Sequence, residues 1–211
     1  MTYRTTAARL DRAQELRERI LQCAHARVVE GGFASLTMQA LAEDVGIATG
    51  SLYRHFGGKG ELAAEVFSNA SRVEVEALAE VLRGPGSATR RLAAGLGQFA
   101  ARAWHSRRLA FALIAEPVDP EVDEQRLLYR EAYAELFVDL LDEGRRSGEF
   151  RVAQVNLVAA CLVGAIAEAL VGPLSPPARA ARDAGLAAPE LADVSQALIT
   201  FCLRAVGAPE S

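Results

Sequence analysis

The segment 37–59 constrains the fold of this chain most, because it contains two short apolar repeats separated by a glycine. In each repeat two large apolar residues lie four positions apart, which places them on the same face of a helix. Gly46 stands between the repeats, where a left-handed turn costs glycine little. Two short helices joined by a tight turn that contains glycine are typical of a helix-turn-helix. The residues predicted to face the core are Leu41 and Val45 before the glycine and Leu52 and Phe56 after it.

The remaining positions of this segment form a polar surface that fits DNA. Thr37 can cap the first helix, and the second helix begins with small residues and ends with hydrogen-bond donors. A small first turn can sit deep in a major groove while the donors behind it reach phosphates. Gln39 and Thr49 are the predicted base contacts, and a glutamine amide can form two hydrogen bonds with adenine. The predicted DNA contacts are Thr37, Gln39, Thr49, Gly50, Ser51, Tyr53, Arg54, His55 and Lys59.

The charge of the chain is distributed unevenly. The net charge is −4, but residues 1–60 hold eight basic and six acidic residues, and the acidic excess lies in residues 61–211. This distribution favours docking of the N-terminal face on a nucleic acid. Lys59 is the one lysine among 23 basic residues and stands where a helix is expected to begin, so we expect it to contact a phosphate.

Several short motifs between residues 15 and 67 resemble the N-terminal domain of TetR-family transcriptional regulators. The resemblance implies an all-helical homodimer whose first three helices bind operator DNA and whose C-terminal helices hold a ligand pocket and the dimer interface. It also implies a repressor that a small-molecule effector releases from DNA. We therefore expect an all-α fold of about nine helices, with a DNA-binding domain at 1–58 and a ligand-binding and dimerisation domain at 59–211. The motifs are Ala24, Gly32-Phe33, Leu36-Thr37, Leu41-Ala42, Gly46-Ile47, the run 50–56 and the run 59–62.

Two helix starts depart from the family pattern. Ala48 stands where a serine commonly caps the second helix of the pair. Gly58 and Gly60 stand where serine and glutamate are more frequent, and glycine weakens a helix interior by about 1 kcal/mol. Both helix starts are therefore expected to be poorly capped.

Apolar periodicity and breaking residues predict further helices along the chain. Asp119-Pro120 is a favoured helix start, with aspartate as N-cap and proline in the first position. The stretch 174–189 is rich in proline, alanine and arginine, so we expect a mobile loop, with one helical turn within it as the alternative. The N-terminal arginines, Arg4, Arg9 and Arg12, are expected on a solvated tail, with phosphate contact as the alternative. The expected helices outside the pair cover 10–30, 59–83, 89–104, 108–115, 119–148, 155–171 and 190–206.

The last two expected helices combine apolar residues at helical spacing with small residues that let backbones approach. A symmetric four-helix bundle between two subunits would bury them and would mirror a palindromic operator. The alternative is that they belong to the core of a monomer. The predicted interface residues are Ala160, Gly164, Ala167, Val194, Leu198, Phe201 and Cys202.

Aromatic residues gather in the middle helices and indicate an apolar pocket for a small hydrophobic or amphipathic effector. His105, Glu168 or Arg130 can serve as its polar anchor, and the alternative is that the aromatics are plain core. The predicted pocket residues are Phe99, Trp104, His105, Phe111, Tyr129, Tyr133, Phe137 and Glu168.

Other features bear on the compartment. Cys23, Cys161 and Cys202 are widely spaced, which predicts buried, reduced thiols in the cytoplasm. Residues 1–14 lack an apolar core, so no signal peptide is expected. The apolar stretch 155–171 is too short for a comfortable membrane span, and we expect a buried helix and no membrane partner.

The histidines of the chain are scattered, and no metal-ligand spacing, phosphate-binding loop or nucleophile elbow is present. The sequence therefore predicts no catalysis, no metal and no cofactor. The competing interpretation is a protein-interaction module that has kept the helix-turn-helix fold without specific DNA binding.

Overall fold

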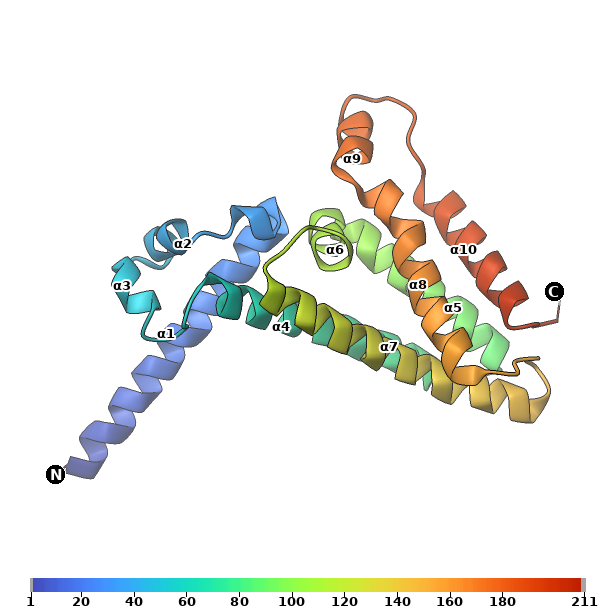
Figure 1. Cartoon of the computed structure of the whole chain (residues 1–211), viewed down its shortest axis with the longest axis horizontal. Helices are drawn as coiled ribbons and strands as arrows, with labels where there is room; N and C mark the ends of the chain where they lie inside the picture. The colour runs from blue at the N-terminus through green and yellow to red at the C-terminus, as the bar shows by residue number, and fades with distance from the viewer. Residues whose placement is uncertain (1, 210–211) are drawn as a thin grey trace.

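The computed structural model describes residues 2–209, with side chains from residue 9 onward. The described residues form helices and connecting segments without a strand, so the all-α prediction is confirmed (Figure 1). This described part of the chain contains ten α-helices, where about nine were expected. They are α1 (Thr2–Gly31), α2 (Met38–Val45), α3 (Thr49–Leu52), α4 (Lys59–Leu82), α5 (Ala88–His105), α6 (Arg107–Ile114), α7 (Pro120–Ser147), α8 (Val155–Leu174), α9 (Pro176–Asp183) and α10 (Leu191–Ala205), with a 3₁₀-helix η1 (Phe33–Ser35) after α1.

The N-terminal unit consists of α1, η1, α2, α3 and the first half of α4, and it lies at one end of the molecule (Figure 1). Its core contains fully buried side chains from every one of these α-helices, among them Ile20, Leu41, Leu52 and Leu62. Arg27 of α1 ties α2 in place, because its guanidinium donates to the Ala40 carbonyl at 3.0 Å and also pairs with Asp44.

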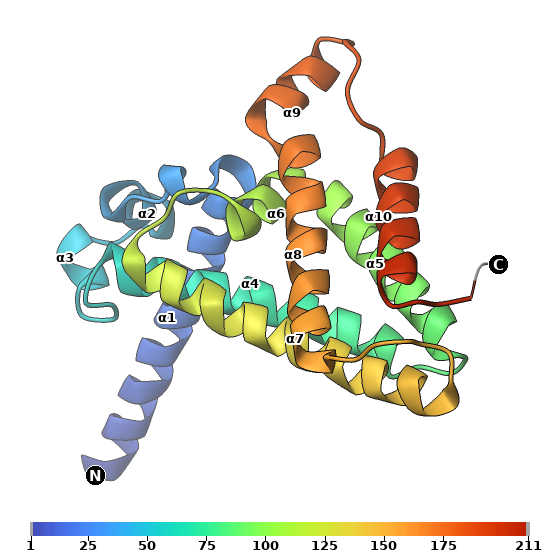
Figure 2. The same cartoon turned by 45° about the vertical axis from the view of Figure 1, so that its right-hand side comes forward.

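The second unit contains the rest of α4 and helices α5 to α10. Helices α4 and α7 lie side by side and run in the same direction, and α8 and α10 pack across the far half of the molecule (Figures 1 and 2). The core of this unit is built around Leu92, Leu96, Phe137 and Leu162. Helix α4 contributes to both cores, and Ala112 of α6 and Val122 of α7 also reach the N-terminal core, so three helices join the two units.

Two expectations for the N-terminal unit are wrong. Helix α1 begins at Thr2 and not near residue 10, because no glycine or proline interrupts residues 2–12. The expected solvated tail is therefore helical; Arg9 and Arg12 are exposed on it, while the Arg4 side chain lies outside the described residues. The second helix of the pair was expected to include the hydrogen-bond donors at its end, but α3 stops at Leu52. The donors follow in a turn in which His55 N–H donates to the Leu52 carbonyl at 2.9 Å.

The stretch 174–189, expected as a mobile loop, contains the two-turn helix α9. Helix α8 continues to Leu174, with Pro173 in its last turn. Ser175 then starts α9, because its Oγ donates to the Gly172 carbonyl at 2.7 Å and accepts from Ala178 N–H at 3.4 Å. The serine cap and the prolines at the first two positions are a favoured helix start.

Candidate nucleic-acid interface and ligand cavity

The helix-turn-helix forms as the segment 37–59 predicts. Thr37 is the N-cap of α2, and its Oγ1 accepts from Ala40 N–H at 3.2 Å. Gly46 adopts the left-handed conformation at φ 73° that ends α2. The four residues predicted to face the core are buried, which fixes the orientation of α3 against α2. They are Leu41, Val45, Leu52 and Phe56.

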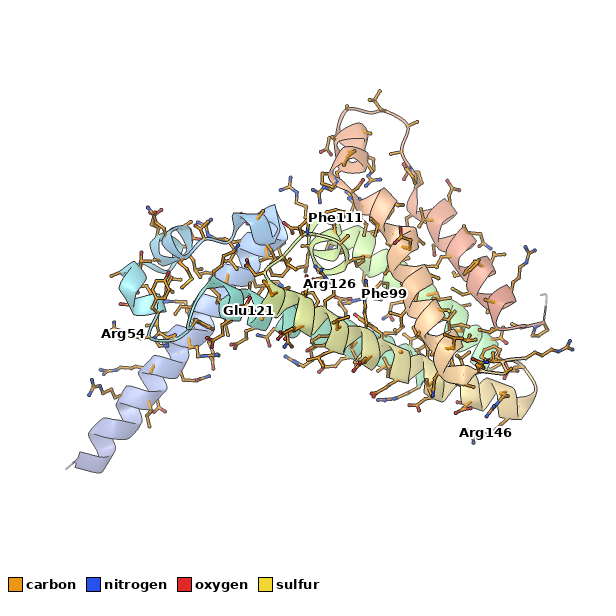
Figure 3. The ribbon with its side chains drawn as sticks, viewed as in Figure 1. Arg54, Phe99, Phe111, Glu121, Arg126 and Arg146 are labelled. Atoms are coloured by element: carbon orange, nitrogen blue, oxygen red, sulfur yellow. The ribbon has the colours of Figure 1, made fainter. Side chains whose placement is uncertain are left out.

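The nine predicted DNA contacts lie at one end of the molecule, and none of them is buried. A side chain at Gly50 would meet no atom within 4 Å, so the first turn of α3 is open to close approach by a ligand. Behind it Tyr53 is 54% exposed, and Arg54 donates to Ser51 Oγ at 2.7 Å on the outer side of α3 (Figure 3). Gln39 reaches only Glu43, at 3.3 Å, and remains exposed. This surface has an open first turn followed by donors.

The helix starts after Ala48 and Gly58 lack side-chain caps, as expected. At α4 a carboxylate from within the helix compensates, because Glu61 Oε2 accepts from Gly57 N–H at 2.6 Å. Gly60 lies beside the first turn of α7. A Cβ at this position would lie 2.5 Å from the carboxylate of Glu121, which is the exposed end of a flexible side chain and can move aside.

The connection between α6 and α7, residues 115–119, holds the N-terminal unit at two points. The Glu116 carboxylate accepts from the N–H groups of Phe33 and Ala34 at 2.9 and 3.0 Å, at the start of η1. Asp119 Oδ2 lies 3.3 Å from Lys59 Nζ. Asp119 is the N-cap of α7 as predicted, but its side chain makes no capping bond and faces Lys59. Sequence reasoning missed both contacts, which join residues about 60 to 80 positions apart.

A cavity of about 100 Å³ lies among α4, α5, α6, α7 and α8. Four predicted pocket residues line it, namely Phe99, Tyr129, Tyr133 and Phe137, and the rings of Phe99 and Tyr133 meet edge to face at 5.8 Å. Burial raises the pKa of Tyr133. Tyr129 donates from its hydroxyl to the Ser68 carbonyl at 2.7 Å, which fixes one wall of the cavity.

The other four predicted pocket residues lie elsewhere. Trp104 and Phe111 are turned toward α9, where the guanidinium groups of Arg182 and Arg179 lie over their rings at 4.8 and 6.0 Å. His105 and Glu168 are exposed, the latter on the outer face of α8. The aromatics of α5 and α6 thus divide between the cavity and the side that α9 covers.

The polar part of the cavity comes largely from residues that periodicity did not identify. Arg102 pairs with Glu74 of α4 through two hydrogen bonds of 2.7 and 2.8 Å. Arg126 donates to the carbonyls of Leu113 at 3.1 Å and Glu116 at 2.9 Å, and burial lowers its pKa. Figure 3 shows Arg126 and Phe99 in the middle of the molecule. Arg130, considered as an anchor from sequence, lines the cavity four residues after Arg126.

The predicted interface residues divide between the core and the surface. Leu198 and Cys202 are buried within the single chain and belong to its core, since α10 packs them against α5 and α8. Ala160, Gly164 and Phe201 are exposed. The remaining two, Ala167 and Val194, are partly buried, and Ala167 also lines the cavity.

Helix α8 is less buried than expected. Among the described residues it is the one helix long and apolar enough to span a membrane by length and composition, and 28% of its most apolar window is buried. Its uncovered face carries Leu157, 58% exposed, and Cys161. The expectation of three buried thiols is thus wrong for Cys161, which is exposed, while Cys23 of α1 is partly buried. Cys202 is buried, which raises its pKa to about 11.

Comparison with known proteins identifies the N-terminal region. Residues 20–66 match the model of bacterial regulatory proteins of the tetR family. HTH-type transcriptional regulators of Staphylococcus aureus strains USA300 and N315 are 42% identical over 50 residues, which cover 24% of this chain. The match spans 27% of the length of each relative.

Solved structures extend the similarity in fold to most of the chain. FadR from Bacillus subtilis, solved in complex with stearoyl-CoA, superimposes with a TM-score of 0.69 at 18% identity, covering 90% of this chain and 98% of FadR. A TetR-family regulator from Agrobacterium tumefaciens gives 0.68 at 19% identity, covering 92% and 98%. The first unit thus matches the tetR family of bacterial regulatory proteins in sequence, and about nine-tenths of the chain shares the fold of these solved regulators.

Proposed function

We propose that this chain is a sequence-specific DNA-binding transcriptional regulator that acts in the cytoplasm as a homodimer and responds to a small hydrophobic or amphipathic effector. The observation that carries the proposal is the surface of α2 and α3. Their large apolar side chains are buried in the core, while the nine small or polar residues of the predicted DNA surface are not buried and lie at one end of the molecule. In this proposal α3 enters the major groove, Gln39 and Thr49 contact bases, and Lys59 contacts a phosphate.

A second copy of the chain is the proposed partner of α8 and α10. A lone chain leaves Leu157, Gly164 and Phe201 uncovered, and pairing of α8 and α10 with their symmetry mates would bury them in a four-helix bundle. Successive major grooves on one side of DNA lie about 34–36 Å apart, so two recognition helices are needed to read a palindromic operator.

The cavity is the proposed effector site, and a short series of contacts leads from it to the N-terminal unit. Arg126 on the cavity wall donates to the Glu116 carbonyl, and the Glu116 carboxylate binds the start of η1. An effector that displaces α6 or Arg126 would alter this contact and shift the population toward a subunit arrangement that no longer matches DNA. The B. subtilis FadR complex with stearoyl-CoA supports a ligand site in this fold. By analogy with the family, the protein represses transcription and the effector relieves that repression.

A mobility-shift assay with the DNA upstream of the chain's own gene tests the proposal at low salt. We expect a specific complex that resists unrelated competitor DNA. Gln39→Ala should weaken binding to the matched operator more than to an operator mutated at the contacted base. Gln98→Ala, the same change on a partly exposed position of α5, outside the proposed DNA surface and the two helices proposed to pair, serves as the control.

Absence of a specific complex would contradict DNA binding and favour the alternative, a helical interaction module that has kept the fold. That outcome would be followed by a search for protein partners of the α2–α3 surface. Equal reduction of affinity on matched and mutated operators would remove Gln39 from the base-reading residues alone.

A further inference from the structure

The cavity wall carries one acidic and three basic side chains in an otherwise mainly apolar lining. Glu74 and Arg102 neutralise one another through their two hydrogen bonds. Arg126 and Arg130 remain, and their spacing of four residues places them on the same face of α7. The wall therefore has an excess of positive charge.

The two remaining arginines differ in how they are held. Arg126 is fixed by backbone carbonyls and by Asp123, whose 58% exposed carboxylate is not part of the cavity wall. Arg130 is exposed at the rim and makes no hydrogen bond or ion pair with any side chain that the structure describes. The planar guanidinium of arginine binds a carboxylate through two parallel hydrogen bonds, so an unpaired arginine beside an apolar cavity suits an acidic amphiphile.

We propose that the cavity binds a monocarboxylate with an apolar body, which places its carboxylate on Arg130 and its body against Phe99, Tyr133 and Phe137. One guanidinium without a partner matches one negative charge. A cationic ligand would be repelled by Arg126 and Arg130, and a neutral one would gain no ion pair with Arg130. The cavity volume of about 100 Å³ limits the ligand to a small apolar body.

This inference rests on the function proposed above, in which the cavity is the effector site, but its test needs no DNA. Calorimetric titration of the full chain would compare hexanoate, octanoate and 4-ethylbenzoate with octan-1-ol and octylamine. We expect the best carboxylate to bind about tenfold to a hundredfold more tightly than octan-1-ol, the range of a hydrogen bond to a charged group. Octylamine should bind most weakly.

Arg130→Gln should abolish the preference for carboxylate over alcohol, and Arg130→Lys should keep part of it. Arg146→Gln removes an exposed arginine near the far end of the same helix and should change nothing (Figure 3). Arg126 is left intact, because its bonds to the Leu113 and Glu116 carbonyls hold α6 in place.

Three results would overturn the inference: octan-1-ol binding as tightly as the best carboxylate, unchanged carboxylate affinity in Arg130→Gln, or no saturable binding by any of the three carboxylates. A chain that binds operator but no carboxylate would refute this inference alone. A chain that binds carboxylate but no DNA would refute the proposed function alone.

Discussion

Lys59 offers the sharpest test of how this chain meets DNA, because its ammonium group lies 3.3 Å from the Asp119 carboxylate. The two side chains are 41% and 40% exposed, so the pair is solvated. Ion pairs of this kind contribute about 0.2–1 kcal/mol. If Lys59 must leave Asp119 to reach a phosphate, that free energy opposes DNA binding in each subunit.

Asp119→Asn should therefore raise operator affinity by about 1.4- to 5-fold per subunit, which is about 0.2–1 kcal/mol expressed as a ratio of dissociation constants. Lys59→Ala should weaken binding to all DNA sequences alike. It should also reduce the slope of log affinity against log salt by about 0.9 for each phosphate that Lys59 neutralises. In the Lys59→Ala background, most of the increase in affinity from Asp119→Asn should disappear.

Fluorescence anisotropy with labelled operator between about 50 and 200 mM salt would measure all four proteins of this cycle. Asp139→Asn is the matched control, since it removes the same charge from an exposed position farther along α7. A salt slope unchanged by Lys59→Ala would show that Lys59 touches no phosphate. An Asp119→Asn affinity equal to that of the unmodified chain would show that the ion pair does not compete with DNA.

Three further predictions concern stability and assembly. Hydrogen bonds from the Thr89 and Ala88 N–H groups lower the pKa of Glu149 from 4.5 to about 2, so the stability that this carboxylate contributes is complete above about pH 4.5 and is lost as the pH falls toward 2. Glu149→Gln should lower the free energy of unfolding by about 1 kcal/mol at about pH 6 and flatten the decline of that free energy in acid. Urea titrations measure both effects, and an unflattened decline would contradict this prediction. Gly144→Ala would place a Cβ 2.1 Å from the Phe150 ring, so we expect a destabilisation of about 1–3 kcal/mol and a lower Tm. An unchanged Tm would mean that the ring moves away without cost and would contradict this prediction. Gly164→Leu enters open space in the single chain and should leave the fold intact while weakening the proposed dimer in sedimentation. A dimer of unchanged affinity would exclude this face of α8 as the interface.

Local chemistry was enough to predict the helix-turn-helix. The spacing of Leu41 and Val45, the glycine at 46 and the threonine cap act over a few residues, and the structure shows each of them as expected. Helical periodicity likewise predicted most of the later helices to within a few residues at each end. The reason is that apolar stripes and helix-breaking residues can be recognised within short segments of sequence.

Tertiary packing decided what no short segment contains. Whether an apolar residue of α10 faces its own core or a second subunit depends on the helices beside it, and Leu198 proved to be core while Phe201 is exposed. The same holds for the aromatics of the middle helices, some of which line the cavity while Trp104 and Phe111 lie beneath α9. The sequence alone thus predicted the tetR-family match of the first unit and the buried and exposed faces of the helix pair, since both rest on local spacing. The folded chain determined which arginines meet at the cavity and how Glu116 and Asp119 reach the N-terminal unit, because these contacts join residues far apart in sequence.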